Sequence, residues 1–204
     1  MPQTDATPIP RYDLYGDQST DVELDFLHIE PIRERSGRND WTIHTHSHPD
    51  HMQVLHVRSG GGTIRMEERE YPIPAPALVV IPVGVVHDIR FKPGTAGHSV
   101  TAAFACVRTA AGSDGRLTDA TLTPAVHALA GSGLSLPGVH DTFHWLHREF
   151  VWSAPGRRAA IMAQFTRVLV ALLRLRLVHG AGTEARGDRN QALMLRYREL
   201  LERH

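Results

Sequence analysis

The sequence predicts a mainly-β domain, a barrel or sandwich of short strands, followed by a helical region. Short apolar segments between residues 21 and 107 alternate with turn-forming residues, and frequent strands of this kind are typical of all-β barrels and sandwiches. The turn-forming residues lie at 36–37, 59–62, 82–84 and 93–94. Beyond residue 110 the apolar residues recur three and four positions apart, which is typical of helices.

The strand-like segments define the expected barrel domain. They span residues 21–32, 40–47, 52–57, 61–67, 75–82, 86–92 and 98–107. Residues 1–20 contain Pro and Asp with little periodicity, so we interpret them as an N-terminal arm. The barrel itself is therefore expected over residues 21–110.

Helices are expected in the second part of the chain, residues 111–204. They span 120–130, 141–152, 157–178 and 188–204. Within 157–178, apolar side chains recur at alternating spacings of four and three, which is a heptad stripe. The stripe consists of Ile161, Phe165, Val168, Leu172 and Leu175. We expect it to form a two-fold seam in a homodimer, and an ordinary buried helix is the alternative.

Composition narrows the class of protein. The chain has 22 basic and 22 acidic residues, so its net charge is zero and it lacks the basic surface that a nucleic-acid backbone requires. The single cysteine, Cys106, excludes an intrachain disulfide and fits a reducing compartment. The N-terminus lacks the pattern of a secretory signal, and the most apolar run, 168–178, is too short to span a bilayer. We therefore expect a cytoplasmic protein without a membrane partner.

Two short motifs place polar residues at fixed spacings in the expected barrel. They consist of His46, His48, Gln53 and Gly60, and of Pro82, Gly84 and His87. Because side chains alternate between the two faces of a strand, His46 and His48 should point the same way. Gly60 and Gly84 suit tight turns. The spacings resemble the two halves of the cupin motif, HxH(x)4E(x)6G and PxGxxH, with Gln53 where cupins usually carry Glu. This resemblance implies a cupin barrel, a double-stranded β-helix, in which four polar side chains converge.

A wider resemblance covers nearly the whole chain. It is carried by residues 9–16, 25–30, 40–62, 75–91 and 189–204. Together with the helices after the barrel, these segments resemble the N-terminal effector domain of AraC-type transcription regulators, closest to the branch of p-hydroxybenzoate-responsive activators. The resemblance implies a cupin barrel, then dimerisation helices, then a DNA-binding half with two helix-turn-helix motifs. Residues 111–204 would then hold the dimerisation region and the start of a linker. Since the chain ends before a helix-turn-helix, we expect it to be truncated and to reach DNA only through that absent half.

The resemblance also implies a small effector in the barrel, a hydroxybenzoate-like aromatic carboxylate. By alternation with the motif residues, further side chains should face inward: His44, Leu55, Val57, Ile89 and Phe91. The carboxylate requires a cation or other donors, for which Arg11 on the arm, Arg65 on a strand and the histidines are candidates. Trp41 is expected to pack over the mouth of the barrel or in its core.

The same polar group offers a second hypothesis. Neutral imidazoles of His46, His48 and His87, with the amide of Gln53 as a fourth ligand, suit a divalent ion such as Zn, Fe or Ni. Gln53 is uncharged, so the affinity for a divalent ion should be lower than with the usual Glu. The leading expectation is a sensor that requires no cofactor and has no catalysis. The competing hypothesis is a metal-dependent cupin enzyme, a dioxygenase or an isomerase.

Overall fold

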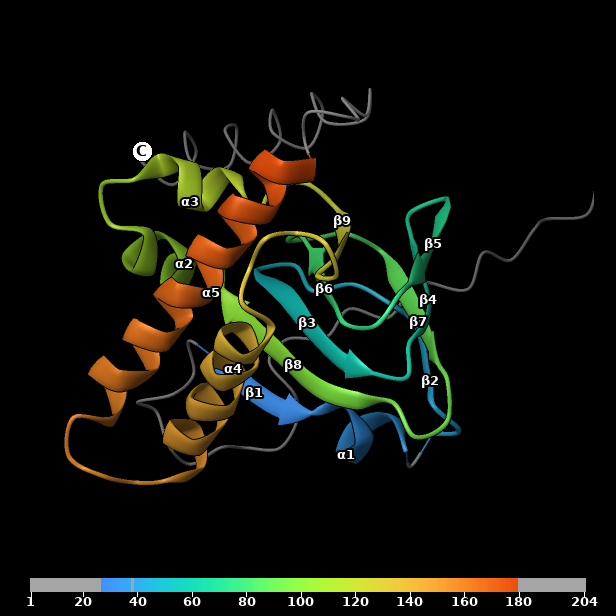
Figure 1. Ribbon diagram of the computed structural model, residues 1–204, viewed down its shortest axis with the longest axis horizontal. Helices are drawn as coiled ribbons and strands as arrows, with labels where there is room; N and C mark the ends of the chain where they lie inside the picture. Colours follow the sequence, from blue (N-terminus) through green and yellow to red (C-terminus); the bar gives the residue numbers. More distant parts are fainter. Residues whose placement is uncertain (1–26, 38, 180–204) are drawn as a thin grey trace, which may run out of the picture.

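The computed structural model describes residues 27–37 and 39–179, and in them two antiparallel sheets face each other (Figure 1). The five-stranded sheet has the order β1-β8-β3-β6-β9 and the four-stranded sheet the order β2-β7-β4-β5. The strands are β1 (Leu27–Pro31), β2 (Thr42–His46), β3 (His51–Ser59), β4 (Gly62–Met66), β5 (Arg69–Ile73), β6 (Ala77–Ile81), β7 (His87–Phe91), β8 (Ala96–Ala103) and β9 (Ala125–Ala128). The predicted mainly-β, cupin-like fold is confirmed.

Helices cover the outer face of the five-stranded sheet, opposite the four-stranded sheet (Figure 1). They are α2 (Phe104–Ala111), α3 (Gly115–Asp119), α4 (Leu136–Val151) and α5 (Arg157–His179), while the short α1 (Ile32–Ser36) follows β1. The hydroxyl of Ser135 caps α4 by accepting the backbone N–H of Gly138 at 3.2 Å. None of the described helices is long and apolar enough to cross a membrane.

Strand β3 separates two hydrophobic cores. Leu55 and Val57 face the four-stranded sheet and belong to the inner core between the sheets. Met52 and Val54 face the opposite way and belong to the outer core beneath the helices. The strand is central, with β6 and β8 as its neighbours, and both of its faces are covered. Its alternation therefore assigns successive side chains to two different environments.

Several predicted elements differ from the structure. Residues 120–130 are not a helix, because β9 lies within them and pairs antiparallel with β6. The alanine-rich segment has helical propensity, but the open edge of β6 offers it backbone partners. Because β9 joins the sheet, the barrel extends past the predicted boundary at residue 110. Strand β5 was not predicted. The predicted strand 98–107 ends at Ala103, and α2 begins at Phe104.

The predicted dimer seam is wrong. The five residues of the heptad stripe on α5 are all fully buried within a single chain, with an exposed fraction of 0%. They pack in the outer core, where α5 contacts α2, α3 and α4. The stripe is therefore already covered by the chain's own elements, as in the alternative of a buried helix. Leu177, by contrast, is 68% exposed near the end of the helix. The predicted arm, Arg11 and the helix 188–204 lie outside the described residues.

Candidate functional site

The motif residues come from both sheets and meet between them. His46 ends β2 and His87 begins β7, and these two residues are directly paired across the four-stranded sheet. Gln53 lies in the middle of β3 in the five-stranded sheet, next to Thr101 of β8. His48 lies in the connection between β2 and β3. The fold thus brings together residues that are 41 positions apart in sequence, from His46 to His87.

A β-bulge in β2 decides which of its side chains face inward. Ile43 pairs with Ile89 and His46 pairs with His87, so three steps on β2 match two on β7. The extra residue reverses the alternation, and Ile43 and His46 share the inner face. His44 is exposed as a result. The prediction that His44 faces the pocket was wrong, because simple alternation from His46 ignores the bulge.

Two glycine turns support the motif. Gly84 has a φ of +76°, which favours glycine, and its N–H donates to the carbonyl of His48 at 2.8 Å. This bond ties the second half of the motif to the first. Gly60 has a φ of +87°, and a Cβ there would lie 2.5 Å from Oγ1 of Thr95. Both positions therefore require glycine for backbone conformation, as the sequence predicted.

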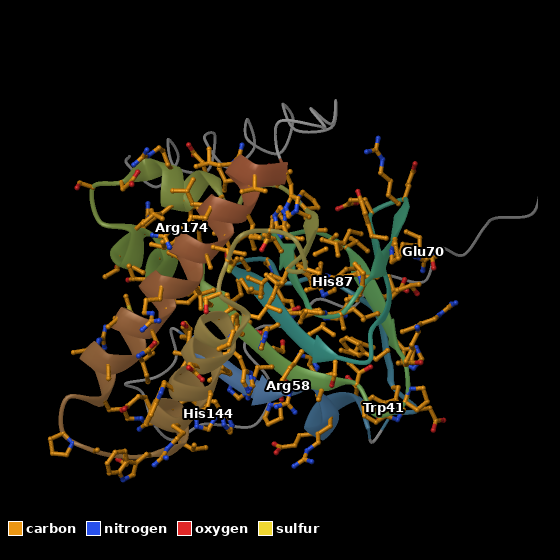
Figure 2. The ribbon with its side chains drawn as sticks, in the orientation of Figure 1. Trp41, Arg58, Glu70, His87, His144 and Arg174 are labelled. Carbon is orange, nitrogen blue, oxygen red and sulfur yellow. The ribbon has the colours of Figure 1, made fainter. Side chains whose placement is uncertain are left out.

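Three buried histidines form one compact group, the inner histidine cluster of His46, His48 and His87. One nitrogen from each can be chosen so that all three lie within 4.8 Å of one another. The ring centroids are 4.2 Å apart for His46 and His87, and 5.0 Å apart for His46 and His48. Figure 2 labels His87 within the barrel, between the two sheets.

Backbone hydrogen bonds orient two of these rings. Nδ1 of His46 lies 2.7 Å from the carbonyl oxygen of His44, and Nδ1 of His87 lies 2.9 Å from that of Val85. A carbonyl can only accept, so both Nδ1 atoms carry the proton and both Nε2 atoms present a lone pair. Burial, followed by the proximity of His46, lowers the pKa of His87 to about 3, and burial also lowers the pKa of His46. Both rings are therefore neutral near pH 7.

Nε2 of His87 is the most informative atom of the cluster. It is buried and has no hydrogen-bond partner among the described residues. A buried acceptor without a partner is costly, which favours a bound group that donates to it or is ligated by it.

Gln53 engages the third histidine. Its Nε2 lies 3.0 Å from Nε2 of His48 and 3.0 Å from Oγ1 of Thr101. In this orientation the amide N–H groups donate to the imidazole and to the hydroxyl. Thr101 was not predicted, since a single threonine has no motif and its role depends on lying beside Gln53 across the sheet.

The other residues predicted to bind the ligand do not all lie at the inner histidine cluster. Arg65 points away from the interior, since its neighbours on β4 are buried, and its Nε donates to Oδ2 of Asp88 at 2.7 Å. The prediction of Arg65 as a pocket residue was therefore wrong. Phe91 is buried in the inner core, and its N–H donates to the carbonyl of Trp41 at 2.8 Å. Trp41 is half-buried and packs against the same core. Arg11 lies outside the described residues.

Arg35 on α1 is a cation that the sequence did not single out. Its side chain is only 11% exposed, and Nη1 donates to Oε1 of Glu30 at 3.3 Å. Its positive charge contributes to the lowered pKa values of both His46 and His87, so it acts on the inner histidine cluster. No sequence signal pointed to Arg35, because α1 itself was not predicted.

The inner histidine cluster suits a divalent transition metal in its donor chemistry. Neutral imidazoles with inward lone pairs are good ligands for Zn, Fe or Ni. Gln53 supplies no negative charge, and its bond to Nε2 of His48 would have to be exchanged, or His48 would have to use Nδ1. The residues therefore fit such an ion, but they also suit hydrogen bonding to an organic ligand.

Comparison with known families supports the ligand-binding interpretation. Residues 28–169 match the AraC-like ligand binding domain, a span that includes both sheets, the inner histidine cluster and most of α5. A comparison with curated proteins finds no match. The matched span covers well over half of the 204 residues, so the chain belongs to the family of AraC-like ligand-binding domains.

Proposed function

We propose that the barrel binds a small aromatic carboxylate with a ring hydroxyl, a hydroxybenzoate-like effector, and that the chain is the sensory part of a transcription regulator. The observation that carries this proposal is the buried Nε2 of His87, which has no partner among the described residues. It lies between two sheets in a domain of a ligand-binding family. A ligand is the kind of group that would satisfy it.

The chemistry of this nitrogen favours a hydroxyl group. Neutral His87 donates through Nδ1 to the backbone, so Nε2 can only accept, and a phenolic O–H is a matching donor. Apolar side chains of the inner core, among them Leu55, Ile89 and Phe91, suit an aromatic ring. Ligand sites of this kind combine apolar walls with a few placed polar groups.

The carboxylate requires a positive charge. No Lys or Arg among the described residues is fully buried, and Arg65 points outward. Arg35 is mostly buried and its charge acts on the inner histidine cluster. We therefore assign the carboxylate to Arg35, in competition with its present partner Glu30.

Membership of the AraC-like family supports a proposal for how effector binding would regulate transcription. In this proposal the chain works as a homodimer, reaches DNA through a separate helix-turn-helix domain, and changes its population of conformations when the effector binds. Since the α5 stripe is buried, a dimer would need another surface. Two exposed aromatic residues, Trp145 on α4 and Trp152 just after it, are candidates for that contact.

Calorimetry with 4-hydroxybenzoate and benzoate tests the binding site. The hydroxyl should strengthen binding to the wild-type chain, and His87→Ala should abolish that advantage by removing its acceptor. His48→Ala should also weaken binding, with losses of about 1–3 kcal/mol for groups left unsatisfied. Equal affinity for the two acids in wild type and in His87→Ala would reject the assignment of the hydroxyl.

A matched pair of arginine variants tests the carboxylate. Arg35→Ala should weaken binding of both acids at least about tenfold, because a charged hydrogen bond is lost. Arg65→Ala removes an arginine that is also paired with a carboxylate, but on the outer surface, and should leave affinity unchanged. An unchanged affinity in Arg35→Ala would remove Arg35 from the site.

The competing function is a metal-dependent cupin enzyme. The observation that favours it is the grouping of three histidine nitrogens within 4.8 Å. An ion held there by His46, His48 and His87 would act as a Lewis acid toward a bound substrate. Near-stoichiometric Fe, Ni or Zn in the purified protein, with turnover of a phenolic substrate that is lost in His46→Ala, would favour this function over sensing alone.

A further inference from the structure

A second group of histidines lies on the opposite face of the five-stranded sheet, beneath α4. This outer histidine cluster consists of His56, His98, His140, His144 and His147. None of these residues belongs to the cupin-like motifs. The cluster is separated from the inner histidine cluster by the sheet itself, because β3 directs Leu55 inward and His56 outward.

Four rings of the outer histidine cluster lie close to one another, while the ring of His144 contacts Trp145. His56 on β3 pairs directly with His98 on β8, and their rings are stacked with centroids 6.4 Å apart. His140 on α4 lies 5.7 Å from His56, and His147, two turns further along the helix, lies 5.3 Å from His98. Phe143 stacks on His56 at 4.6 Å and forms the apolar floor of the group. Two strands and one helix thus direct imidazoles to one place.

Three buried nitrogens of the outer histidine cluster lack hydrogen-bond partners in the part of the chain that the structure describes. The Nδ1 atoms of His56, His98 and His140 are all buried and have no hydrogen-bond partner among the described residues. His56 as a whole is only 2% exposed. Arg58 donates through Nη1 to Nε2 of His140 at 3.4 Å, and since arginine can only donate, Nε2 accepts and the ring proton is on Nδ1. His140 therefore holds a buried N–H donor that requires an acceptor.

The side chains that act on His56 and His98 are all basic. Burial lowers the pKa of His56 to about 3 and that of His98 to about 4. The charged or titratable side chains that contribute further to these shifts are His98, His140 and Arg58 for His56, and His147, His140, His144 and Arg58 for His98. At the margin of the cluster, the carboxylate of Glu34 opposes the effect of burial on the pKa of His147. A negative charge would be stabilised among these groups.

A metal ion fits this place poorly. Nitrogens that share one ion at about 2.1 Å can be no more than roughly 4.2 Å apart. Among the described residues, the inner histidine cluster is the group of three or more ligands that meets a spacing limit of 4.8 Å, and the outer one does not. The guanidinium of Arg58 would also repel a cation. An oxyanion has several oxygens and can accept from donors that are further apart.

We propose that the outer histidine cluster and Arg58 bind a small oxyanion, a phosphate or carboxylate group, between β3, β8 and α4. His140 donates through Nδ1, Arg58 supplies the permanent charge, and His56 and His98 complete the site. Arg58 and His144 are exposed at the margin of the sheet and of α4, which gives the site a side open to solvent (Figure 2). Because the anion contacts both layers, its binding stabilises the packing of α4 on the sheet.

Nuclear magnetic resonance of the histidine rings in the full chain tests the site. Inorganic phosphate and acetate are titrated separately at pH 7, with chloride added to keep the ionic strength constant. We expect saturable shifts of the His56, His98 and His140 rings and no shift of His87, which lies across the sheet. The anion that saturates at the lower concentration identifies the preferred oxyanion.

Two matched variants sharpen the result. Arg58→Gln should weaken binding at least about tenfold, because a charged donor is lost. Arg90→Gln alters an exposed arginine on β7 of the other sheet and should leave binding unchanged. Unchanged His87 shifts in both variants show that the fold is retained.

The proposal is overturned by any of three results. These are linear, non-saturating shifts with both anions up to millimolar concentrations, equal anion affinity in Arg58→Gln and wild type, and stoichiometric binding of Zn²⁺ at His56, His98 and His140 in place of an anion.

Discussion

A histidine cluster lies on each side of the five-stranded sheet, and the comparison between them separates burial from function. On the inner side, His87 of the four-stranded sheet has a pKa of about 3, and on the outer side His56 of the five-stranded sheet has a pKa of about 3 as well. Burial is the largest cause in both cases. Two histidines with the same titration behaviour therefore need not serve the same purpose.

Hydrogen bonding at Nδ1 makes the difference. In the inner histidine cluster, backbone carbonyls fix Nδ1 of His46 and His87 as donors, so the rings present lone pairs inward. In the outer histidine cluster, Nδ1 of His56, His98 and His140 has no partner among the described residues, and Arg58 occupies Nε2 of His140. The first arrangement suits a metal ion or a ligand that donates a hydrogen bond. The second suits a negatively charged group that accepts hydrogen bonds.

The largest expected effect concerns the packing of the outer face. Leu172→Glu places a charge in the core between α5 and the sheet, where Leu172 is fully buried, and should lower the free energy of unfolding by more than about 3 kcal/mol. Leu177→Glu, on the exposed side of the same helix, should change it by less than about 0.5 kcal/mol. Urea denaturation measures both. If Leu172→Glu instead produced a stable, folded monomer from a dimer, the seam would have been the correct interpretation.

Acid should lower the free energy of unfolding of the protein through both histidine clusters. The folded-state pKa values of His56 and His87, about 3, lie below the ordinary value of 6.5, so as pH falls below 6.5 the unfolded chain takes up protons that the folded chain does not. The stability present above pH 6.5 is then lost progressively, at up to about 1.4 kcal/mol per pH unit for each histidine.

Removing one histidine from each face tests whether the two respond equally. His56→Gln and His87→Gln should each flatten the pH dependence of the unfolding free energy by a similar amount. Urea denaturation at a series of pH values, in buffers with chloride as the anion, measures this dependence. Thr142→Val, a buried change on α4 that removes no titrating group, should leave the slope unchanged. A slope that is unaffected by either histidine variant would contradict the assigned burial of that ring.

A smaller effect is expected on the affinity for Zn²⁺, which should depend on the inner histidine cluster and not on the outer one. Gln53→Glu adds the negative charge that the inner histidine cluster lacks and should strengthen Zn²⁺ binding by about tenfold or more. Chelator competition measures the affinity, with Gln53→Leu as the uncharged control. His140→Gln on the outer face should have no effect. Weaker binding in Gln53→Glu would show that the ion, if it binds, is not held near residue 53.

The smallest effect is expected at His44. Its side chain is exposed, and only its backbone carbonyl serves the cluster, by accepting from His46. His44→Ala should therefore change the unfolding free energy by less than about 0.5 kcal/mol and leave effector affinity intact. His46→Ala in the same calorimetric assay should weaken effector binding. Equal losses in both variants would mean that the bulge in β2 does not exclude His44.

Much of the architecture and of the inner histidine cluster was predictable from local patterns. Turn residues at regular intervals indicated the strands, and α5 was predicted at 157–178 where it spans Arg157–His179. His46, His48, Gln53 and His87 were identified because glycine turns and strand alternation restrict spacing within a motif. The buried apolar face of α5 was also evident, but the stripe could not show what covers it, since a partner chain and the chain's own sheet both bury leucines.

The sequence by itself determined the β-then-helix order, the motif residues and the turns at Gly60 and Gly84, because these depend on neighbours along the chain. Only the tertiary structure decided that β9 completes the sheet, that the bulge turns His44 outward, and that Arg35 acts on the inner histidine cluster. It also decided that His56, His98 and His140, spread over 85 positions, form one group with Arg58. Such contacts depend on strand pairing and helix packing between distant segments, for which no local spacing in the sequence is diagnostic.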